Sequence, residues 1–251
     1  MGLAGRLAGL YARSIYLPGT IVSQSLRRTS RRMRGVTRGQ ATRLPQAGWR
    51  GLFPAKAIAL VQARKNAGDV NLAELAVLTT AAATIEAGDE IIEIGTFDGR
   101  TTLNLALNSR PHLAVLTLDL PPGQTSHFPL APGERAFVDK PRSGRHFRDA
   151  RGALAIPAAR ITQLYGDSAR FDWTPHFGRA GLVFVDGSHA YEYVIADSEA
   201  ALRLVTGKGV VIWHDYGVWD GVTRALEDIE THRRLGLRHI RGTSLVAWKS
   251  A

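Results

Sequence analysis

The chain has 251 residues, of which 45% are hydrophobic, and it contains no cysteine. This length allows one α/β domain or two small ones with a large core, the lack of cysteine excludes disulfides and thiolate metal sites, and the lack of any run of about 18 apolar residues excludes a membrane-spanning helix. The formal net charge is +10, but the first 50 residues hold ten arginines and no acid, so the rest is balanced at 22 basic against 22 acidic residues.

Residues 1–50 form a basic leader that includes the stretch SLRRTSRRMRGVTRG, residues 25–39. The first interpretation is a flexible, solvated tail, because residues 25–39 have almost no apolar side chains to bury; we expect them to be dispensable for folding of the rest. The alternatives are a membrane-surface anchor, with apolar residues of the segment 3–15 on one helical face, and an organelle transit peptide. A nucleic-acid interpretation of the net charge would depend on this leader alone.

Residues 51–251 have the pattern of one α/β domain. Helical spacing predicts helices in AKAIALVQARKNA (55–67) and LAELAVLTTAAATIEA (72–87), with Gly88 ending the second. The alternation that follows predicts a Rossmann-like, doubly wound, mostly parallel seven-stranded sheet with a C-terminal antiparallel hairpin. The expected strands are 90–95, 113–119, 160–165, 181–186, 208–214 and two joined at Gly242; the expected helices are 100–109, 190–205 and 219–233.

A glycine turn follows the first of these strands, in the stretch IIEIGTFDGRTTLNLAL (91–107). A dinucleotide fingerprint is excluded, because its third and sixth positions, counted from Gly95, are Phe97 and Arg100; a phosphate-binding P-loop is excluded because no Gly-Lys-Ser/Thr follows. What remains is an acid-x-Gly-x-x-x-Gly pattern that begins at Glu93 and ends at Gly99.

Each later parallel strand also ends in a polar or acidic residue. Asp119 ends VLTLDLP, where a carboxylate can accept both hydroxyls of a ribose. Asp167 follows the third strand in LYGDSARF, Asp186 the fourth in LVFVDGSHAYE, and the pair His214 and Asp215 the fifth in GKGVVIWHDYG. A hydrophobic core alone would not require this pattern, so the shared edge of the sheet is the predicted ligand site.

On these motifs, residues 88–232 resemble a class I S-adenosylmethionine-dependent methyltransferase, in particular the subgroup with Asp-Gly-x-His after strand four and His-Asp after strand five, as in methyltransferase domain family 24. The resemblance implies S-adenosylmethionine as cofactor; because this molecule has no pyrophosphate, the third glycine of the dinucleotide turn is not needed. It further implies that the methionine part is held by Glu93, Gly95, Thr96 and Gly99, the ribose by Asp119, and the adenine region by Asp167 and Ser168.

The ends of strands four and five, about 4.8 Å apart, are the expected reaction site. Metal-dependent sugar, macrolide and catechol O-methyltransferases hold a divalent ion with acids at this place, so the resemblance implies a cation at Asp186, His214 and Asp215. Oxygen ligands favour magnesium, although His214 departs from the usual acid or amide and leaves manganese, iron or no metal open.

Asp186 and His189 are the expected catalytic residues. His189 opens the helix after strand four, and an unperturbed pKa of about 6.5 would let its imidazole take the proton of an acceptor hydroxyl. The alternative is that His189 only caps the helix or bonds Asp186. Tyr191, Tyr216 and Trp219 are candidates for an acceptor pocket, or core residues.

A long insertion, residues 121–159, separates strands two and three and is expected to be a substrate lid. Its five arginines and Lys140 could meet an acidic substrate, although a solvated loop explains them as well.

The sequence as a whole predicts metal-assisted methyl transfer to a hydroxyl of a small, sugar-like acceptor. We expect no specific nucleic acid and a cytoplasmic protein. The sequence leaves peripheral membrane contact through the leader and assembly into a homo-oligomer open. Two alternatives stay open: a leader-driven nucleic-acid or membrane-associated binding protein with a non-catalytic domain, and a hydroxylase-like activity on the same fold.

Overall fold

The computed structural model describes residues 42–54, 56–62, 70–140 and 142–250. The expectations for residues 25–39 and for the second half of the helix predicted at 55–67 lie outside these residues. Within the described ranges, no helix combines the length and the apolar character that a membrane crossing requires.

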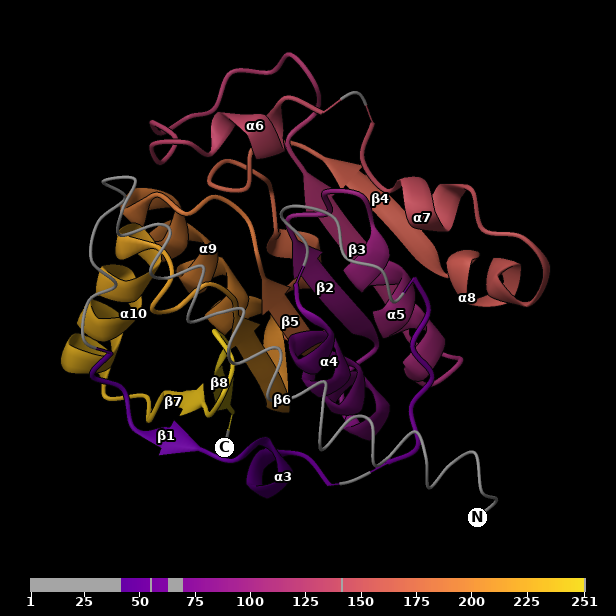
Figure 1. Ribbon diagram of the computed structural model, residues 1–251, viewed down its shortest axis with the longest axis horizontal. Helices are drawn as coiled ribbons and strands as arrows, with labels where there is room; N and C mark the ends of the chain where they lie inside the picture. The colour runs from indigo at the N-terminus through magenta and orange to yellow at the C-terminus, as the bar shows by residue number, and fades with distance from the viewer. Residues whose placement is uncertain (1–41, 55, 63–69, 141, 251) are drawn as a thin grey trace. The chain divides into compact units, whose positions relative to one another are not determined.

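The centre of the fold is one eight-stranded sheet with the strand order β1-β7-β8-β6-β5-β2-β3-β4 (Figure 1). Neighbouring strands from β6 to β4 are parallel, and β8 runs antiparallel to both β6 and β7. The seven predicted strands and the C-terminal hairpin are therefore confirmed. The strands are β1 (Gln46–Ala47), β2 (Glu90–Ile94), β3 (Ala114–Asp119), β4 (Ile161–Tyr165), β5 (Ala180–Val185), β6 (Val205–Trp213), β7 (Arg238–Ile240) and β8 (Val246–Lys249).

The eighth strand, β1, comes from the segment that the sequence assigned to the leader. It has two residues and pairs in parallel with β7. A strand this short has no alternation of apolar and polar residues to reveal it, since only its partner defines it. The flanking side chains of Leu44 and Phe53 are buried, and the backbone N–H groups of Arg43 and Leu44 donate to the Tyr216 hydroxyl. Residues 42–53 therefore pack with the domain.

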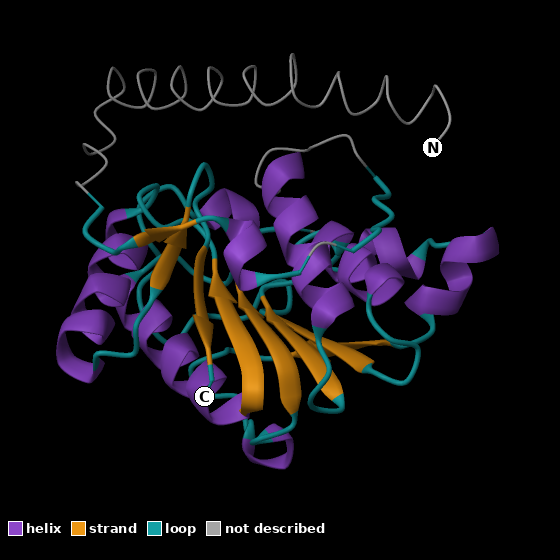
Figure 2. Cartoon of the chain, turned by 90° about the horizontal axis from the view of Figure 1, so that it is seen from below, coloured by secondary structure: helices purple, strands orange, loops and turns teal. Residues whose placement is uncertain are grey.

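Helices cover both faces of the sheet (Figure 2). On one face α9 and α10 pack on Ile92 and Ile94; on the other, α4 and α5 pack on Ile91, as the two-residue period of a strand requires. The long helices are α4 (Leu72–Thr84), α5 (Arg100–Asn108), α9 (Tyr191–Leu204) and α10 (Asp220–Arg233). The short ones are α3 (Trp49–Leu52), α6 (Arg135–Val138), α7 (Arg145–Arg148) and α8 (Ala155–Ala158), with 3-10 turns η2 (Gly152–Leu154) and η3 (Thr174–His176).

The helix predicted at 55–67 is wrong in its described part, because residues 56–62 have no helical structure. Side chains of α5 supply the hydrogen bonds instead. The Asn108 amide bonds the backbone N–H and C=O of Ala59, and the Asn104 amide does the same for Val61. These amides take the place of a neighbouring strand, so the backbone is satisfied without a helix.

The strand order reverses between β2 and β5, because the chain first moves outward through β3 and β4 and then returns to β5 on the other side of β2. In parallel sheets such a reversal opens a crevice at the carboxyl ends of the strands, where ligands bind. The insertion, which includes α6 and α7, lies at this end (Figure 1).

Candidate active site

Backbone hydrogen bonds hold the strand ends together at the carboxyl edge. Gly95 N donates to Leu118 O at 2.8 Å and Asp186 N to Ile94 O at 2.8 Å, while His214 N donates to Val185 O at 3.0 Å. The ladder therefore continues one residue past each strand, into the residues expected to bind ligands. The side chains of Asp186 and His214 consequently start from fixed backbone positions.

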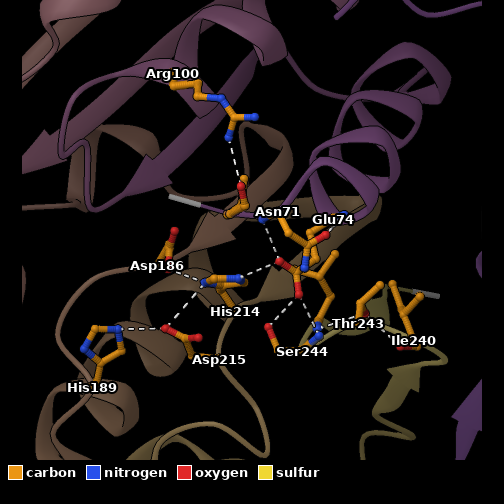
Figure 3. A network of polar contacts seen from close by, with 12 residues as sticks. Asn71, Glu74, Arg100, Asp186, His189, His214, Asp215, Ile240, Thr243 and Ser244 are labelled. Carbon is orange, nitrogen blue, oxygen red and sulfur yellow. Dashed lines mark hydrogen bonds and ion pairs between the residues drawn. The ribbon is translucent and has the colours of Figure 1, made fainter. Parts of the chain in front are cut away.

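Beyond β5 and β6 lies a chain of alternating acids and imidazoles, which we call the polar cluster: Glu74, Glu134, Asp186, His189, His214 and Asp215 (Figure 3 shows all but Glu134). His214 Nδ1 lies 2.9 Å from Asp186 Oδ1 and 3.5 Å from Asp215 Oδ2, and its Nε2 lies 3.3 Å from Glu74 Oε2. His189 Nε2 lies 2.9 Å from Asp215 Oδ2. Asp215 therefore links the two imidazoles.

Glu134 reaches the polar cluster from the insertion. Its Oε1 accepts a 2.7 Å hydrogen bond from His189 N and lies 3.1 Å from His189 Nδ1, and its Oε2 accepts one from Ser188 Oγ at 3.0 Å. The residue is 2% exposed. Sequence reasoning missed it, because nothing local distinguishes Glu134 from Asp139 and Asp149, the other acids of the insertion.

Glu74 was missed as well, because it lies in α4, more than a hundred residues before its partners. Its Oε2 forms the reciprocal N-terminal cap with Asn71, while its Oε1 accepts hydrogen bonds from Ser244 N and Ser244 Oγ, both at 2.8 Å. Burial acts to raise the pKa of Glu74, but the charge and hydrogen bond of His214, with the Ser244 and Asn71 N–H groups, lower it to about 2. Asn71 and Glu74 form a capping box at the start of α4, and such a local pattern gives no sign of a role at the site.

Both imidazoles of the polar cluster are protonated near neutral pH in this arrangement. Burial alone would lower the pKa of His189, but Asp215 and Glu134 raise it to about 9. Burial likewise opposes protonation of His214, yet Asp186, Asp215 and Glu74 hold its pKa well above the usual value. The unperturbed pKa on which the sequence based a proton-accepting role for His189 therefore does not apply here.

The structure groups potential cation ligands differently from the sequence. Single ligand atoms of Asp186, His189 and Asp215 lie within 4.8 Å of one another, whereas both ring nitrogens of His214 face carboxylates. The ring nitrogens of His189 also face carboxylates, those of Glu134 and Asp215, so this contact does not separate the two histidines as ligands. The ligand role expected of His214 stays a prediction, and His189 is a second candidate.

Charge and backbone geometry are both unusual at the polar cluster. Four carboxylates face two imidazoles. Burial, with a smaller repulsion from Asp215, raises the pKa of Asp186 against the opposing effect of His214. Asp215 has a φ of +63°, a left-handed conformation that is uncommon outside glycine and often found at functional sites. The donor set fits a divalent cation.

The two glycines of the turn after β2 are required for different reasons. Gly95 has a φ of +100°, and a Cβ there would lie 2.1 Å from the Asp186 carbonyl oxygen. Gly99 has a φ of +81°, and a Cβ there would lie 2.6 Å from the ring of Phe147 in the insertion. The turn is therefore pressed against the end of β5 on one side and against the insertion on the other.

Glu93 and Thr96 use their side chains inside the fold. The buried Glu93 carboxylate accepts hydrogen bonds from Thr102 Oγ1 and Thr117 Oγ1, and burial raises its pKa to about 8. The Thr96 hydroxyl lies 2.7 Å from Thr117 Oγ1 and accepts from Gln163 Nε2. These contacts fix the strand end from which the turn starts.

Asp119 and Asp167, expected at the ribose and adenine, lie beyond β3 and β4. Lys140 Nζ lies 3.0 Å from Asp119 Oδ1 and 2.9 Å from Oδ2, and burial raises the pKa of Asp119. Asp167 Oδ2 accepts hydrogen bonds from Tyr193 Oη and His127 N. A cavity of about 520 Å³ opens beside Asp167, between residues 124–127 of the insertion and residues 166–172.

The three candidate aromatic residues have separate roles. The Trp219 ring is stacked on His189 at 4.3 Å with an interplanar angle of 10°. Tyr216 is buried in the core, and the Tyr191 hydroxyl donates to Asp228 on α10. Only Trp219 is in direct contact with the polar cluster, on the face of the imidazole.

Comparisons with known proteins agree with this geometry. A family model described as a methyltransferase domain matches residues 92–216, which include the glycine turn and most of the polar cluster. No curated protein matches the chain.

Solved methyltransferases share the fold at low sequence identity. The O-methyltransferase TomG from Streptomyces achromogenes, involved in tomaymycin synthesis and solved with SAM, is 17% identical with a TM-score of 0.50, over 76% of this chain and 93% of that chain. The O-methyltransferase NovP is 15% identical with a TM-score of 0.51, over 72% and 81%. The calicheamicin methyltransferase CalS11 is 16% identical with a TM-score of 0.50, over 71% and 77%.

Proposed function

We propose that this chain, which belongs to the class I S-adenosylmethionine-dependent methyltransferases, transfers the methyl group to a hydroxyl oxygen of a small molecule bound at Asp186, His189 and Asp215. The observation that carries the proposal is the contact of the glycine turn with the end of β5, where Gly95 is packed against the backbone of Asp186. A donor on the turn and an acceptor at the polar cluster would thus be neighbours, as methyl transfer requires.

The cofactor fits the other half of the carboxyl edge. Asp119 offers two carboxylate oxygens to the ribose hydroxyls, and the cavity beside Asp167 has room for an adenine. Because the side chains of Glu93 and Thr96 are engaged inside the fold, we assign the methionine part to the backbone of the turn at Gly95 and Gly99.

A divalent cation would be held by the carboxylates of Asp186 and Asp215. Magnesium fits two carboxylates with retained waters, and this ligand set leaves His189 for proton transfer. Bound there, the cation would supply charge that lowers the pKa of an acceptor hydroxyl. The grouping of ligand atoms of Asp186, His189 and Asp215 within 4.8 Å supports a cation at this place.

His189 is the group that we assign to the proton of the acceptor hydroxyl. Asp215 and Glu134 orient its ring from both nitrogens, and Trp219 holds its face. With both acids ionised the ring is protonated, and a protonated ring cannot accept a proton. The role therefore requires that bound ligands balance part of the surrounding negative charge, which lowers the pKa of His189.

The acceptor class is a small hydroxylated molecule, sugar-like in its polarity. Support comes from TomG and NovP, which are O-methyltransferases, and from the oxygen-rich polar cluster, which suits a hydroxyl better than an amine or carbon. The basic residues of the insertion add a preference for an acceptor with negative charge.

The test is methyl transfer from radiolabelled S-adenosylmethionine to a panel of hydroxylated small molecules, before and after chelation and with metal added back. Calorimetric titration of S-adenosylmethionine should show binding to the wild-type chain. No binding would contradict the methyltransferase assignment at this edge. Full activity in chelator would contradict the cation assignment but not the proposed methyl transfer.

A further inference from the structure

The insertion contacts the carboxyl edge at several places, and three of these contacts are made to an acid or imidazole that is expected at the site. The backbone N–H of His127 donates to Asp167, Glu134 contacts His189, and Lys140 contacts Asp119. The Lys140 contact differs from the other two, because it is an ion pair on the carboxylate that we assign to the cofactor ribose.

Lys140 covers both oxygens of that carboxylate. Its Nζ lies 3.0 Å and 2.9 Å from the two oxygens of Asp119, and the side chains of Lys140 and Asp119 are only 11% and 9% exposed. A ribose would offer two hydroxyl donors to the same two oxygens. The ammonium group therefore stands where the ribose must bind.

We propose that Lys140 is an internal competitor of the cofactor: it holds Asp119 until S-adenosylmethionine displaces it, and so lowers cofactor affinity and couples cofactor binding to movement of the insertion. The inference rests on the proposed function, because it needs Asp119 to be the ribose ligand. In this role Lys140 competes with the ribose for Asp119 and takes no part in the chemistry at the polar cluster.

The surroundings of Lys140 allow the displacement. Within the described residues, its ammonium group contacts Asp119 and, at 3.4 Å, the Phe137 carbonyl oxygen, which belongs to the same insertion. The helix α6 before Lys140 has four residues and no buried side chain. Among these contacts of the ammonium group, the Asp119 carboxylate is the one that belongs to the sheet, and the nearest backbone anchor of the insertion is the hydrogen bond from Gly144 N to Phe97 O at 2.9 Å.

The alternative is that Lys140 is a structural ion pair that leaves cofactor affinity unchanged. The two cases predict different changes in cofactor affinity when Lys140 is removed. A competitor reduces the fraction of protein that is ready to bind, so its removal tightens binding in proportion to that fraction. A structural pair that shapes the site would weaken binding when it is removed.

The experiment is calorimetric titration of S-adenosylmethionine into the full chain, at one pH for all variants. We expect Lys140→Ala to tighten binding about tenfold. Arg142→Ala is the matched control, because Arg142 has the same charge, lies in the same insertion and, within the described residues, forms its ion pair with the exposed Asp149 at 3.7 Å; it should stay within about twofold. Lys140→Met keeps the aliphatic stem, and is used if the alanine variant does not fold.

Two further measurements make the result specific. In an Asp119→Asn background, Lys140→Ala should change the affinity for S-adenosylmethionine less than about twofold, because the carboxylate for which Lys140 and the ribose compete is absent. Hydrogen exchange of residues 121–150 should be faster in ligand-free Lys140→Ala than in the wild type, and should rise in the wild type when S-adenosylmethionine binds.

Unchanged or weaker binding in both Lys140 variants, with binding in the wild type, would overturn this inference alone. Equal exchange of the insertion in wild type and Lys140→Ala would do the same. Absence of binding in every variant would overturn the proposed function together with it.

Discussion

The two halves of the carboxyl edge hold their acidic side chains in different ways. At β5 and β6, Asp186 and Asp215 are held by His214, which α4 supports in turn through Glu74. At β3 and β4, Asp119 is held by Lys140 of the insertion, and Asp167 by the His127 backbone of the insertion together with Tyr193 of α9. The first half is fixed by long elements of the domain, and the second depends in part on a segment with only short helices.

This difference matches the two proposed roles, which are the reaction at β5 and β6 and the entry of the cofactor at β3 and β4. Reacting groups must keep their geometry, so they are best placed where packed elements determine each rotamer. A cofactor must enter and leave, so its acids are better covered by a segment that can be displaced. Glu134 is the exception, because it belongs to the insertion but contacts His189 in the β5 and β6 half. The following variants test how separate the halves are.

The largest effect is expected for the imidazole at the boundary between the halves. His189→Ala should lower turnover about 10²–10⁴-fold, because it removes the group assigned to proton transfer. Affinity for S-adenosylmethionine should stay within about twofold, since ribose and adenine are assigned to the other half. Initial rates and calorimetry measure the two quantities, with the exposed His232→Ala as control. A variant with near-normal turnover would contradict the role of His189.

Removal of Glu74 tests the rigidity of the β5 and β6 half. Glu74→Ala should lower the free energy of unfolding by about 3–5 kcal/mol, because it leaves the buried His214 without one of its carboxylates and Ser244 without its acceptor. Denaturant unfolding gives the value. Glu86→Ala, at an exposed ion pair with Arg110, should change it by less than about 0.5 kcal/mol. Equal values for the two variants would refute the supporting role of α4.

The same carboxylate predicts a dependence of stability on pH. The pKa of Glu74 is about 2 in the folded chain against the usual 4.5, so its contribution is fully present above about pH 4.5 and is lost as pH falls toward about 2. The shift corresponds to about 3 kcal/mol. The free energy of unfolding should therefore fall less steeply between about pH 6 and about pH 3 for Glu74→Gln than for the wild type. Parallel curves would show that the depressed pKa does not contribute.

In the other half, Asp119→Ala should weaken S-adenosylmethionine binding by about 1–3 kcal/mol, because the ribose loses its charged acceptor. Turnover at saturating cofactor should change little, in contrast to His189→Ala. Asp139→Ala, an exposed acid of the same insertion, is the calorimetric control. Unchanged affinity would remove the ribose assignment.

The smallest effect is expected away from both halves. Asn104→Ala should lower the free energy of unfolding by about 1 kcal/mol, since it removes the hydrogen bonds that hold Val61 beside α5. Catalysis and cofactor affinity should be unaffected. A loss of cofactor affinity would connect residues 56–62 to the site, and the separation of roles would have to be redrawn.

The sequence predicted the elements that carry their own signal. The strands before Asp119, Asp186 and Asp215 are short apolar runs with an acid at the end, and parallel topology places such ends at one edge. The glycine turn was marked by Gly95 and Gly99, both of which have a positive φ. By contrast, the periodicity was misleading at residues 56–62, because side-chain amides of α5 satisfied the backbone.

By itself, then, the sequence determined seven strands of the sheet, the order of elements along the chain and the acids at the carboxyl edge, because apolar periodicity and strand-end residues are local properties. Only the tertiary structure decided which partner each acid has: Glu74 for His214, Glu134 for His189 and Lys140 for Asp119. Those pairs join segments tens to more than a hundred residues apart. Charge, burial and protonation depend on what is near in space, and no local pattern of residues encodes that.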